Sequence, residues 1–194
     1  MLDGEIERLD RAVKTFMNFT RPVELKLEET RLQELLGEVL DAARPSVTRA
    51  GLVLRADLRS DCPPVRADRQ LIHQAVLNLV LNASVFTDPG GTITLRLRRS
   101  GDHAVIAVED SGRGIPPEDQ KKIFQLFFTT RPGGTGIGLA NTFRFVQLNS
   151  GRIEFESQPG RGTTFRVKLP LAPASKVRGA KVPNLGKPSA AGKR

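Results

Sequence analysis

Two glycine clusters joined by an aromatic run constrain this chain more than any other feature of its sequence. The first lies within Asp110–Gly114 and follows an alternating apolar run that ends at Val108, so it predicts a strand that opens into a loop. The second lies within Gly133–Gly138 and precedes a helical pattern from Leu139, so it predicts a loop that closes onto a helix N-terminus. Glycine lets the backbone approach a ligand closely, and a helix N-terminus offers unpaired N–H groups to phosphate. The two clusters therefore indicate a phosphate-containing ligand.

The hydrophobic pattern predicts an alternation of helices and strands around these clusters. Apolar residues at helical spacing predict helices over residues 2–20, 32–43, 69–86 and 139–149. Alternating residues predict strands over 52–58, 65–67, 93–97, 105–108, 153–155 and 165–169, with a strand or an extended linker over 23–27. The fold class that follows is α+β, a mixed β-sheet with helices over one face, preceded by a long N-terminal helix.

Specific residues are expected to begin and end these helices. Thr30 and Gln33 resemble a capping box, and Asp68 is expected to cap the helix that follows it. Pro45 is expected to end the first of these two helices. Gly151 is expected to close the helix that begins near Leu139.

Charge and composition narrow the class of protein. The formal net charge is +9, but residues 171–194 carry six lysines and arginines and no acid, and without them the chain has 24 basic against 21 acidic residues. The excess is therefore mostly a basic tail, which we expect to be disordered, and no nucleic-acid partner is expected. The single cysteine excludes an internal disulfide framework. The sequence shows no membrane-spanning run and a charged N-terminus, so we expect a cytoplasmic segment without membrane contact.

Polar residues near the clusters suggest how the ligand is held. Asn78 and Asn82 are four residues apart, so they share one face of the predicted helix, where amide oxygens can present themselves to a hard cation. Asp110 can accept a hydrogen bond from an exocyclic amine, and Arg131 can reach phosphate. Taken singly, these features are also typical of surface asparagines, a turn aspartate and a solvated arginine.

Four motifs in order resemble the N, G1, F and G2 boxes of the histidine-kinase ATP-binding domain, whose fold is shared with gyrase B, Hsp90 and MutL. They are Asn78-Leu-Val-Leu-Asn82-Ala, Asp110-Ser-Gly112-Arg-Gly114, Phe124 through Phe127-Phe128-Thr-Thr-Arg131-Pro, and Gly134-Thr-Gly136-Ile-Gly138-Leu. The compact lid resembles the NtrB type. Residues 1–22 resemble the second helix of the dimerisation and phosphoacceptor hairpin, truncated, and residues 23–170 the catalytic ATP-binding domain, a Bergerat-type sandwich.

The resemblance implies ATP or ADP as ligand, with Mg²⁺. Asp110 would bind the adenine amine with Thr164 assisting through water, Asn82 would ligate Mg²⁺, and Asn78 would support the metal or the phosphates. The nucleotide-binding residues that it implies are Asn78, Asn82, Asp110, Gly112, Gly114, Arg131, Gly134, Thr135, Gly136, Ile137, Gly138, Leu139 and Thr164, with Asn78 and Asn82 as the catalytic pair.

Two departures from the family pattern bear on activity. The family often has a basic residue three positions after the metal asparagine, whereas this chain has Val85. The phosphoacceptor histidine motif is absent, and His73 and His103 are the only histidines. We therefore expect a kinase fragment that binds ATP-Mg but cannot phosphorylate itself alone.

The resemblance also implies partners, and it leaves two other functions open. The expected partners are the phosphoacceptor-helix domain and, through the full kinase, a response regulator, with weak self-association through the N-terminal helix. One alternative is an ATP hydrolase of the gyrase or Hsp90 class, which places a general-base glutamate where this chain has Asn78. The other is a nucleotide-binding interaction module.

Overall fold

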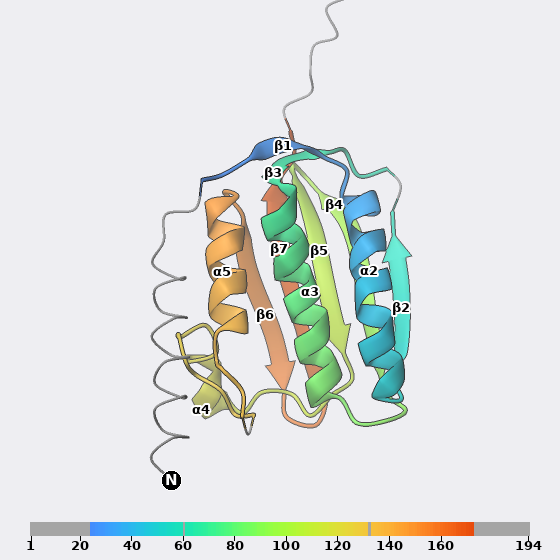
Figure 1. Ribbon diagram of the computed structural model, residues 1–194, viewed down its shortest axis with the longest axis vertical. Coiled ribbons are helices and arrows are strands. Elements are labelled where there is room, and N and C mark those ends of the chain that lie inside the picture. The colour runs from blue at the N-terminus through green and yellow to red at the C-terminus, as the bar shows by residue number, and fades with distance from the viewer. Residues whose placement is uncertain (1–23, 60, 132, 173–194) are drawn as a thin grey trace, which may run out of the picture.

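The computed structural model of the chain describes residues 24–59, 61–131 and 133–172 (Figure 1). The predicted N-terminal helix and residues 173–194 lie outside the described residues. The elements, in chain order, are β1 (Leu27–Thr30), α2 (Leu32–Arg49), β2 (Val53–Leu58), β3 (Val65–Asp68), α3 (Arg69–Phe86), β4 (Thr92–Ser100), β5 (His103–Asp110), α4 (Pro117–Gln120), α5 (Gly138–Leu148), β6 (Arg152–Gln158) and β7 (Gly162–Pro170).

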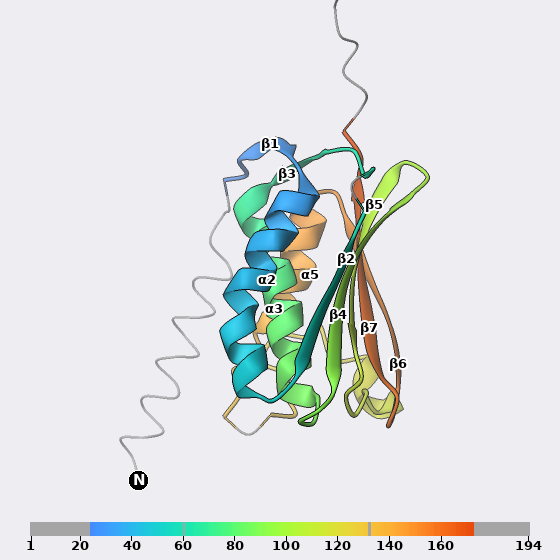
Figure 2. The same ribbon diagram turned by 90° about the vertical axis from the view of Figure 1, so that its right-hand side faces the viewer.

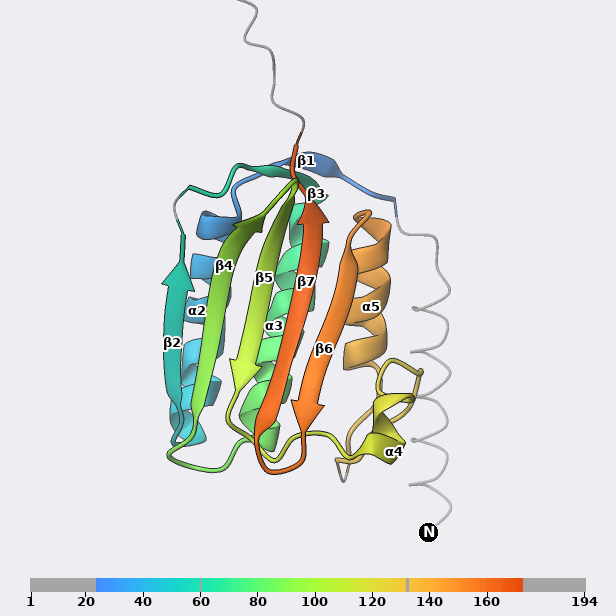
Figure 3. The ribbon, with the colours of Figure 1, turned by 180° about the vertical axis from the view of Figure 1, so that it is seen from behind.

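Five strands form one mixed sheet in the order β2-β4-β5-β7-β6, in which β2 runs parallel to β4 and the other neighbours are antiparallel. Helices α2, α3 and α5 cover one face of this sheet, so the molecule has two layers (Figure 2). The view from behind shows the other face of the sheet without a helix over it (Figure 3). The predicted α+β architecture, a mixed sheet with helices over one face, is confirmed.

Strand alternation separates the two faces of the sheet chemically. The inward side chains of the central strands, such as Ile93, Leu95 and Ile106, are fully buried against the helices. The outward positions carry charge, and Arg96 pairs there with both Asp57 and Glu109 across neighbouring strands. Only inward side chains at the end of a strand can therefore contribute to a site between the sheet and the helices.

A small antiparallel pair, β1 with β3, closes the end of the molecule where α3 begins (Figure 1). Asp68 ends β3 and caps α3, because its Oδ1 accepts from Leu71 N at 3.1 Å, as the sequence predicts. Its backbone N–H donates to the buried amide of Asn149 at 2.6 Å, which ties the start of α3 to the end of α5.

The predicted capping box at Thr30 is wrong. Thr30 is the last residue of β1, and its buried hydroxyl donates to Ala67 O instead of accepting from a backbone N–H of α2. The N-cap of α2 is Arg31, which makes no side-chain cap, and Gln33 instead donates to Cys62 O at 2.9 Å. Pairing with β3 competes successfully with the local cap for Thr30.

Two predicted helix ends also differ from the structure. Helix α2 continues through Pro45 to Arg49, because Pro45 faces solvent while Val47, two residues later, is buried in the core. After α5 the left-handed residue is Ser150, with φ 56°, and not Gly151. Gly151 lies against Leu169, where a Cβ would approach the side chain to 2.8 Å.

None of the helices in the described part of the chain has the length and apolarity needed to cross a membrane.

Candidate functional site

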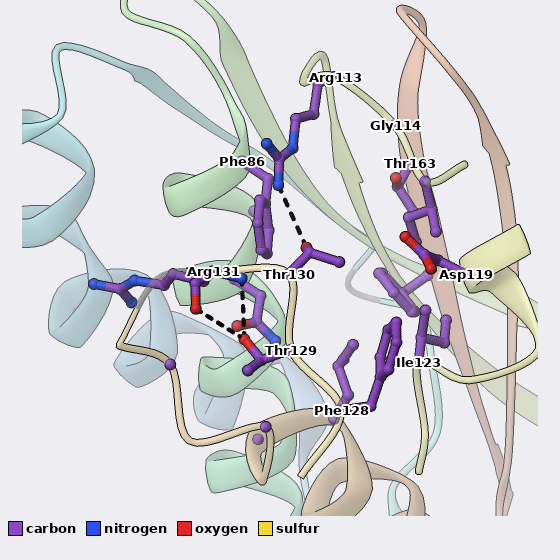
Figure 4. A pocket seen from close by; sticks show the side chains of 18 of the residues that line it. Phe86, Arg113, Gly114, Asp119, Ile123, Phe128, Thr129, Thr130, Arg131 and Thr163 are labelled. Carbon is purple, nitrogen blue, oxygen red and sulfur yellow. Dashed lines mark hydrogen bonds between the residues drawn. The ribbon is translucent and has the colours of Figure 1, made fainter. Parts of the chain in front are cut away.

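A cavity of 510 Å³ opens where the ends of α3, β5 and β7 meet the start of α5. One side is formed by the strand ends and the loop after β5, and the other by the lid, which we define as the described residues 124–131 and 133–137 (Figure 4). Its volume is within the range of about 300–1,000 Å³ that is typical of small-molecule sites. Segments far apart in sequence therefore contribute to one enclosed site.

Asp110 is held at the end of β5 with its side chain on the inward face. Its Oδ1 accepts from Gly112 N at 2.9 Å and from Thr163 N at 3.2 Å. Burial raises the pKa of Asp110 above its ordinary value, and these two backbone hydrogen bonds oppose the shift. One carboxylate oxygen is thus bound by the protein, and no other bond of the described chain engages Oδ2, which can accept from a ligand.

The glycines after Asp110 are required by contacts within the protein. A Cβ on Gly112 would lie 2.3 Å from Phe86 O, and one on Gly114, whose φ is +70°, would lie 2.1 Å from Gln158 O. The loop is therefore pressed between the end of α3 and the β6–β7 turn. This close packing fixes the position of Asp110 before any ligand is present.

Asn78 and Asn82 both line the cavity from α3 but have different surroundings. Asn78 Nδ2 donates to Gly138 O at 2.8 Å, so it attaches the first residue of α5 to α3. Asn82 is half-buried and makes no side-chain hydrogen bond to the described residues. Neither amide oxygen accepts a hydrogen bond from the described residues, but Asn82 is the one of the two whose whole amide is unengaged, so it can turn its oxygen toward a cation.

The lid is anchored at one end by aromatic packing. The ring of Phe124 lies 5.2 Å from that of Phe143 and 6.4 Å from that of Phe165, measured between centroids. Beyond this anchor, Phe127 N donates to Gly136 O at 2.9 Å, and both residues have positive φ. The arms of the lid are thus linked to each other more than to the body of the domain.

Two arginines border the mouth of the cavity in different ways. Arg113 stacks over the ring of Phe86 at 4.7 Å and donates to Thr130 Oγ1 at 3.4 Å, which links the loop after β5 to the lid (Figure 4). The side chain of Arg131 extends away from Thr163 and Asp119 (Figure 4). It is exposed and makes no ion pair with the described residues.

Most of the predicted site residues lie together in the structure. Those that line the cavity are Asn78, Asn82, Asp110, Gly114, Arg131, Gly134, Thr135, Gly136, Gly138 and Leu139. Gly112 lies behind Asp110, and Ile137 is the N-cap residue of α5, so neither lines the cavity.

Thr164 is a third predicted residue that does not line the cavity. It lies opposite Glu109 and alternates with the buried Phe165, so it shares the outward face of the sheet. Thr163, its neighbour, is 6% exposed, lies opposite Asp110 and lines the cavity. Strand alternation thus puts Thr163, and not Thr164, on the inward face beside Asp110, so Thr163 is the threonine that we carry forward to the proposed function.

Sequence reasoning also missed lining residues that periodicity could have found. Phe86 is four residues after Asn82, so it continues the face of α3 that carries both asparagines. Thr163 has the parity of Phe165 and Val167, which are inward. Arg113 and Asp119 carry no such signal, because the cavity takes them from a loop and from the unpredicted helix α4.

A metal at this site would depend on the ligand as much as on the protein. No group of three or more His, Cys, Asp or Glu side chains that could hold an ion occurs among the described residues. Asn82 offers one unpartnered amide oxygen, a donor that suits Mg²⁺, which is commonly held by one or two protein ligands together with phosphates and water. The donor set therefore fits Mg²⁺ bound together with a polyphosphate.

Comparison with family models gives one match. Residues 67–173 match the family described as histidine kinase-, DNA gyrase B-, and HSP90-like ATPase. Among curated proteins, the chain is similar to the signal transduction histidine-protein kinase AtoS of Escherichia coli (strain K12), at 34% identity over 170 residues. The match covers 87% of this chain and 28% of AtoS, so the chain spans less than a third of that relative.

Solved structures similar to this chain include those of histidine kinases. The catalytic domain of histidine kinase ThkA matches with a TM-score of 0.68 and 30% identity, covering 75% of this chain and 95% of that one. Full-length ShkA in complex with AMPPNP matches with a TM-score of 0.75 and 26% identity, covering 89% of this chain and 37% of that one. ThkA also matches as its complex with the response regulator TrrA, with a TM-score of 0.73 and 27% identity, covering 90% of this chain and 50% of that one.

Proposed function

The chain belongs to the histidine kinase-, DNA gyrase B-, and HSP90-like ATPase family, as a sensor histidine kinase ATP-binding domain, and from this we propose that it binds ATP with Mg²⁺ and donates the γ-phosphoryl group to a histidine on a separate acceptor helix. The observation that supports this most is the difference in polarity between the two walls of the cavity. A half-buried carboxylate, Asp110, lies on one wall, and the amides of α3 and the N-terminus of α5 lie on the other. ATP carries an amine donor at one end and anionic phosphates at the other.

The adenine amine binds to Asp110 in this proposal. The carboxylate accepts the amine hydrogen bond through the oxygen that the backbone N–H groups of Gly112 and Thr163 leave free. The apolar side chains of Ala83, Ile123 and Phe165 line the same cavity and can cover the faces of the ring. A water beside the Thr163 hydroxyl can serve the ring nitrogen next to the amine.

The phosphates extend toward Asn82 and the start of α5. The unpaired N–H groups and dipole of the α5 N-terminus favour the negative charge, and Asn82 would hold Mg²⁺ through its amide oxygen. Bound Mg²⁺ supplies charge neutralisation for the transferring phosphoryl group. Arg131 on the lid would add a mobile cation.

The acceptor histidine would come from another chain or domain. His73 and His103 are the only histidines of the sequence, and neither lines the cavity. His103 lies at the β4–β5 turn, bound to Asp102 at 2.6 Å, and His73 lies on α3 near Glu38. A phosphoacceptor-helix domain and, in the full kinase, a response regulator are the partners that we propose, in line with the ThkA–TrrA complex.

Hydrolysis of ATP by this chain would be slow. The position of the general base in the hydrolase class is Asn78, an amide that cannot abstract a proton from water and that already donates to Gly138 O. The site can therefore position and neutralise phosphates but has no base for water among the residues that hold them.

The test is a titration of the chain with an ATP analogue and Mg²⁺ by calorimetry, followed by incubation with labelled ATP. We expect binding that raises the melting temperature, since a ligand at a hundredfold excess over Kd adds about 2.7 kcal/mol to the free energy of unfolding. Labelled ATP should leave this chain unlabelled and should label an added two-helix acceptor fragment. Acid-labile label on this chain alone, or no transfer to a matched fragment, would refute the proposed transfer.

A further inference from the structure

A second, open hollow of 530 Å³ adjoins the cavity on the side of α2. It is lined by the last turn of α2, the exposed stripe of α3 and Arg131 of the lid. Asn78, Asn82 and Arg131 line both the cavity and this hollow, which we call the side hollow. A ligand that reaches Asn82 from the Asp110 end can therefore continue into the side hollow.

The side hollow differs from the cavity in charge. The cavity is lined by two carboxylates, Asp110 and Asp119, and by two arginines, Arg113 and Arg131. The side hollow is lined by Arg49 and Arg131, with no carboxylate among its lining residues. Its other polar groups include the hydroxyl of Ser46 and the amide of Asn82, so its composition suits an anion.

Both arginines of the side hollow are unpaired within the described part of the chain. Arg49 and Arg131 are exposed, and neither makes an ion pair there, whereas Arg44 on the same helix pairs with Asp41 at 3.6 Å. The side chain of Arg131 is directed away from the wall formed by Thr163 (Figure 4). Two guanidinium groups thus share one open hollow without a protein anion between them.

Helix α3 brings no charge of its own to this hollow. Its stripe there consists of Asn78, Leu81, Asn82, Ser84 and Val85, and Val85 is 41% exposed. The hydroxyl of Ser84 donates to Leu81 O within the helix. The cations of the side hollow therefore come from outside α3, Arg49 from α2 and Arg131 from the lid.

We propose that the side hollow receives the terminal phosphates of the nucleotide and that Arg49 contacts them, an inference that rests on the proposed binding of ATP. Arg49 is outside the four motifs and belongs to a helix that contributes nothing to the adenine end. Its role is to distinguish di- and triphosphates from the monophosphate. Arg131 approaches the same phosphates from the lid, so one fixed and one lid-borne cation flank them.

Arg49 also has a structural explanation, which the test must separate. It lies in the last turn of α2, where a positive charge interacts favourably with the helix dipole. That role would lower the melting temperature when Arg49 is replaced. It would not change the ratio of ATP affinity to AMP affinity, which reports contacts to the phosphates alone.

The experiment measures ATP and AMP affinity, with Mg²⁺, by calorimetry on the full chain. We expect Arg49→Gln to weaken ATP about tenfold, as the loss of one charge-assisted contact predicts, and to leave AMP unchanged. Arg44→Gln is the matched control and should change neither affinity. Adding Val85→Lys to Arg49→Gln should restore part of the ATP affinity, because it returns a cation to the same hollow from α3.

The outcomes separate this inference from the proposed function. An equal loss for ATP and AMP, an unchanged ATP affinity in Arg49→Gln, or the same loss in Arg44→Gln overturns the role of Arg49 while ATP binding stands. A parent chain that binds neither nucleotide overturns the proposed function and the inference together. If Arg49→Gln does not fold, Arg49→Lys is measured instead; it keeps the charge but loses the fork of donors, and a weaker ATP affinity with unchanged AMP affinity supports the role.

Discussion

The two walls of the cavity are built in opposite ways. The strand-side wall, Asp110–Ile115 with Thr163, is held by backbone contacts on several sides: Arg113 N donates to Phe86 O, and Ile115 N donates to Ser157 Oγ at 2.8 Å. The lid is attached by the packing of Phe124 and Phe128 against the core and by the weak bond from Arg113 to Thr130. Both walls are rich in glycine, yet only the first is close-packed against the rest of the domain.

This difference assigns separate tasks to the two walls. In the proposed function, a carboxylate whose position is fixed before binding would select the base at little entropic cost, since nothing has to be ordered around it. A lid held mainly by its own contacts can adjust to phosphates and can release them after transfer. We therefore expect changes in the strand-side wall to alter base selection and stability, and changes in the lid to alter affinity alone.

The largest effect should come from Asp110→Asn. The amide can keep the bonds from Gly112 and Thr163 only by presenting its N–H₂ to the adenine amine, so donor meets donor. A hydrogen bond to a charged group contributes about 1.5–3 kcal/mol, so ATP should bind about 10- to 100-fold more weakly. Calorimetry measures this. Glu109→Gln, next in sequence but on the outward face beside Arg96, is the control and should leave the affinity unchanged.

A pair of alanine substitutions tests the difference in packing directly. Gly112→Ala forces a Cβ to within 2.3 Å of Phe86 O in the body, and we expect a loss of about 1–3 kcal/mol in the free energy of unfolding. Gly136→Ala makes an equally close contact, 2.3 Å from the carbonyl carbon of Phe127, but both residues belong to the lid. The lid can move as a unit, so global stability should hold while ATP affinity falls.

Denaturant unfolding and hydrogen exchange distinguish the two results. Gly37→Ala is the control for a helical glycine, because its Cβ would meet no atom within 4 Å, and it should be neutral or stabilising. Equal destabilisation by Gly112→Ala and Gly136→Ala would contradict the distinction between the walls. Faster exchange of lid amides in Gly136→Ala, with unchanged exchange in β5, would support it.

The pH dependence of binding should follow Asp110. Burial raises the pKa of the Asp110 carboxyl, so the folded chain binds this proton more readily than the unfolded chain. Protonation of Asp110 therefore increases the free energy of unfolding as the pH falls through that raised pKa. Exposed carboxyls beside arginines, such as Glu38 beside Arg69, have a lowered pKa, so their contribution to the stability of the folded chain is lost as the pH falls. Nucleotide affinity should fall in the window where Asp110 becomes protonated, because a neutral carboxyl loses acceptor strength.

The test compares the parent with Asp110→Asn from neutral to acidic pH. The variant should lose more stability than the parent on acidification, since it lacks the group whose protonation helps folding. Its residual ATP affinity should be less sensitive to pH than that of the parent. Parallel curves for both chains would mean that Asp110 does not titrate in this range.

The sequence predicts the architecture well where periodicity is strong. Helix α3 has the predicted bounds and the predicted cap at Asp68, because its apolar arc and its cap agree. Sequence-based prediction fails where contacts with a distant segment determine the local structure. Thr30 pairs with β3 instead of capping α2, and Pro45 stays within α2 because Val47 is buried in the core. These outcomes depend on tertiary contacts that no local pattern contains.

The site shows the same division. The motifs brought together Asp110, both asparagines and most of the lid, because each motif carries its own backbone requirement. Arg49, Arg113 and Asp119 enter the site only through the packing of α2, the loop after β5 and α4, so sequence reasoning could not select them. Thr163 is different, since strand alternation from Phe165 would have been enough to select it, although the sequence analysis named Thr164 instead.

The smallest predicted effect tests that placement. Thr163→Val removes a buried hydroxyl that lies 2.9 Å from Ser157 Oγ beside Asp110, and it should weaken ATP about two- to tenfold, as expected for one neutral hydrogen bond worth about 0.5–1.5 kcal/mol. Thr163→Ser keeps the hydroxyl and should keep the affinity. Thr164→Val, on the outward face opposite Glu109, should leave the affinity unchanged.

The reverse result, a loss at Thr164 and none at Thr163, would return the adenine-side role to Thr164. It would also mean that the strand-side wall rearranges on binding, which would contradict the inference that this wall is fixed before binding.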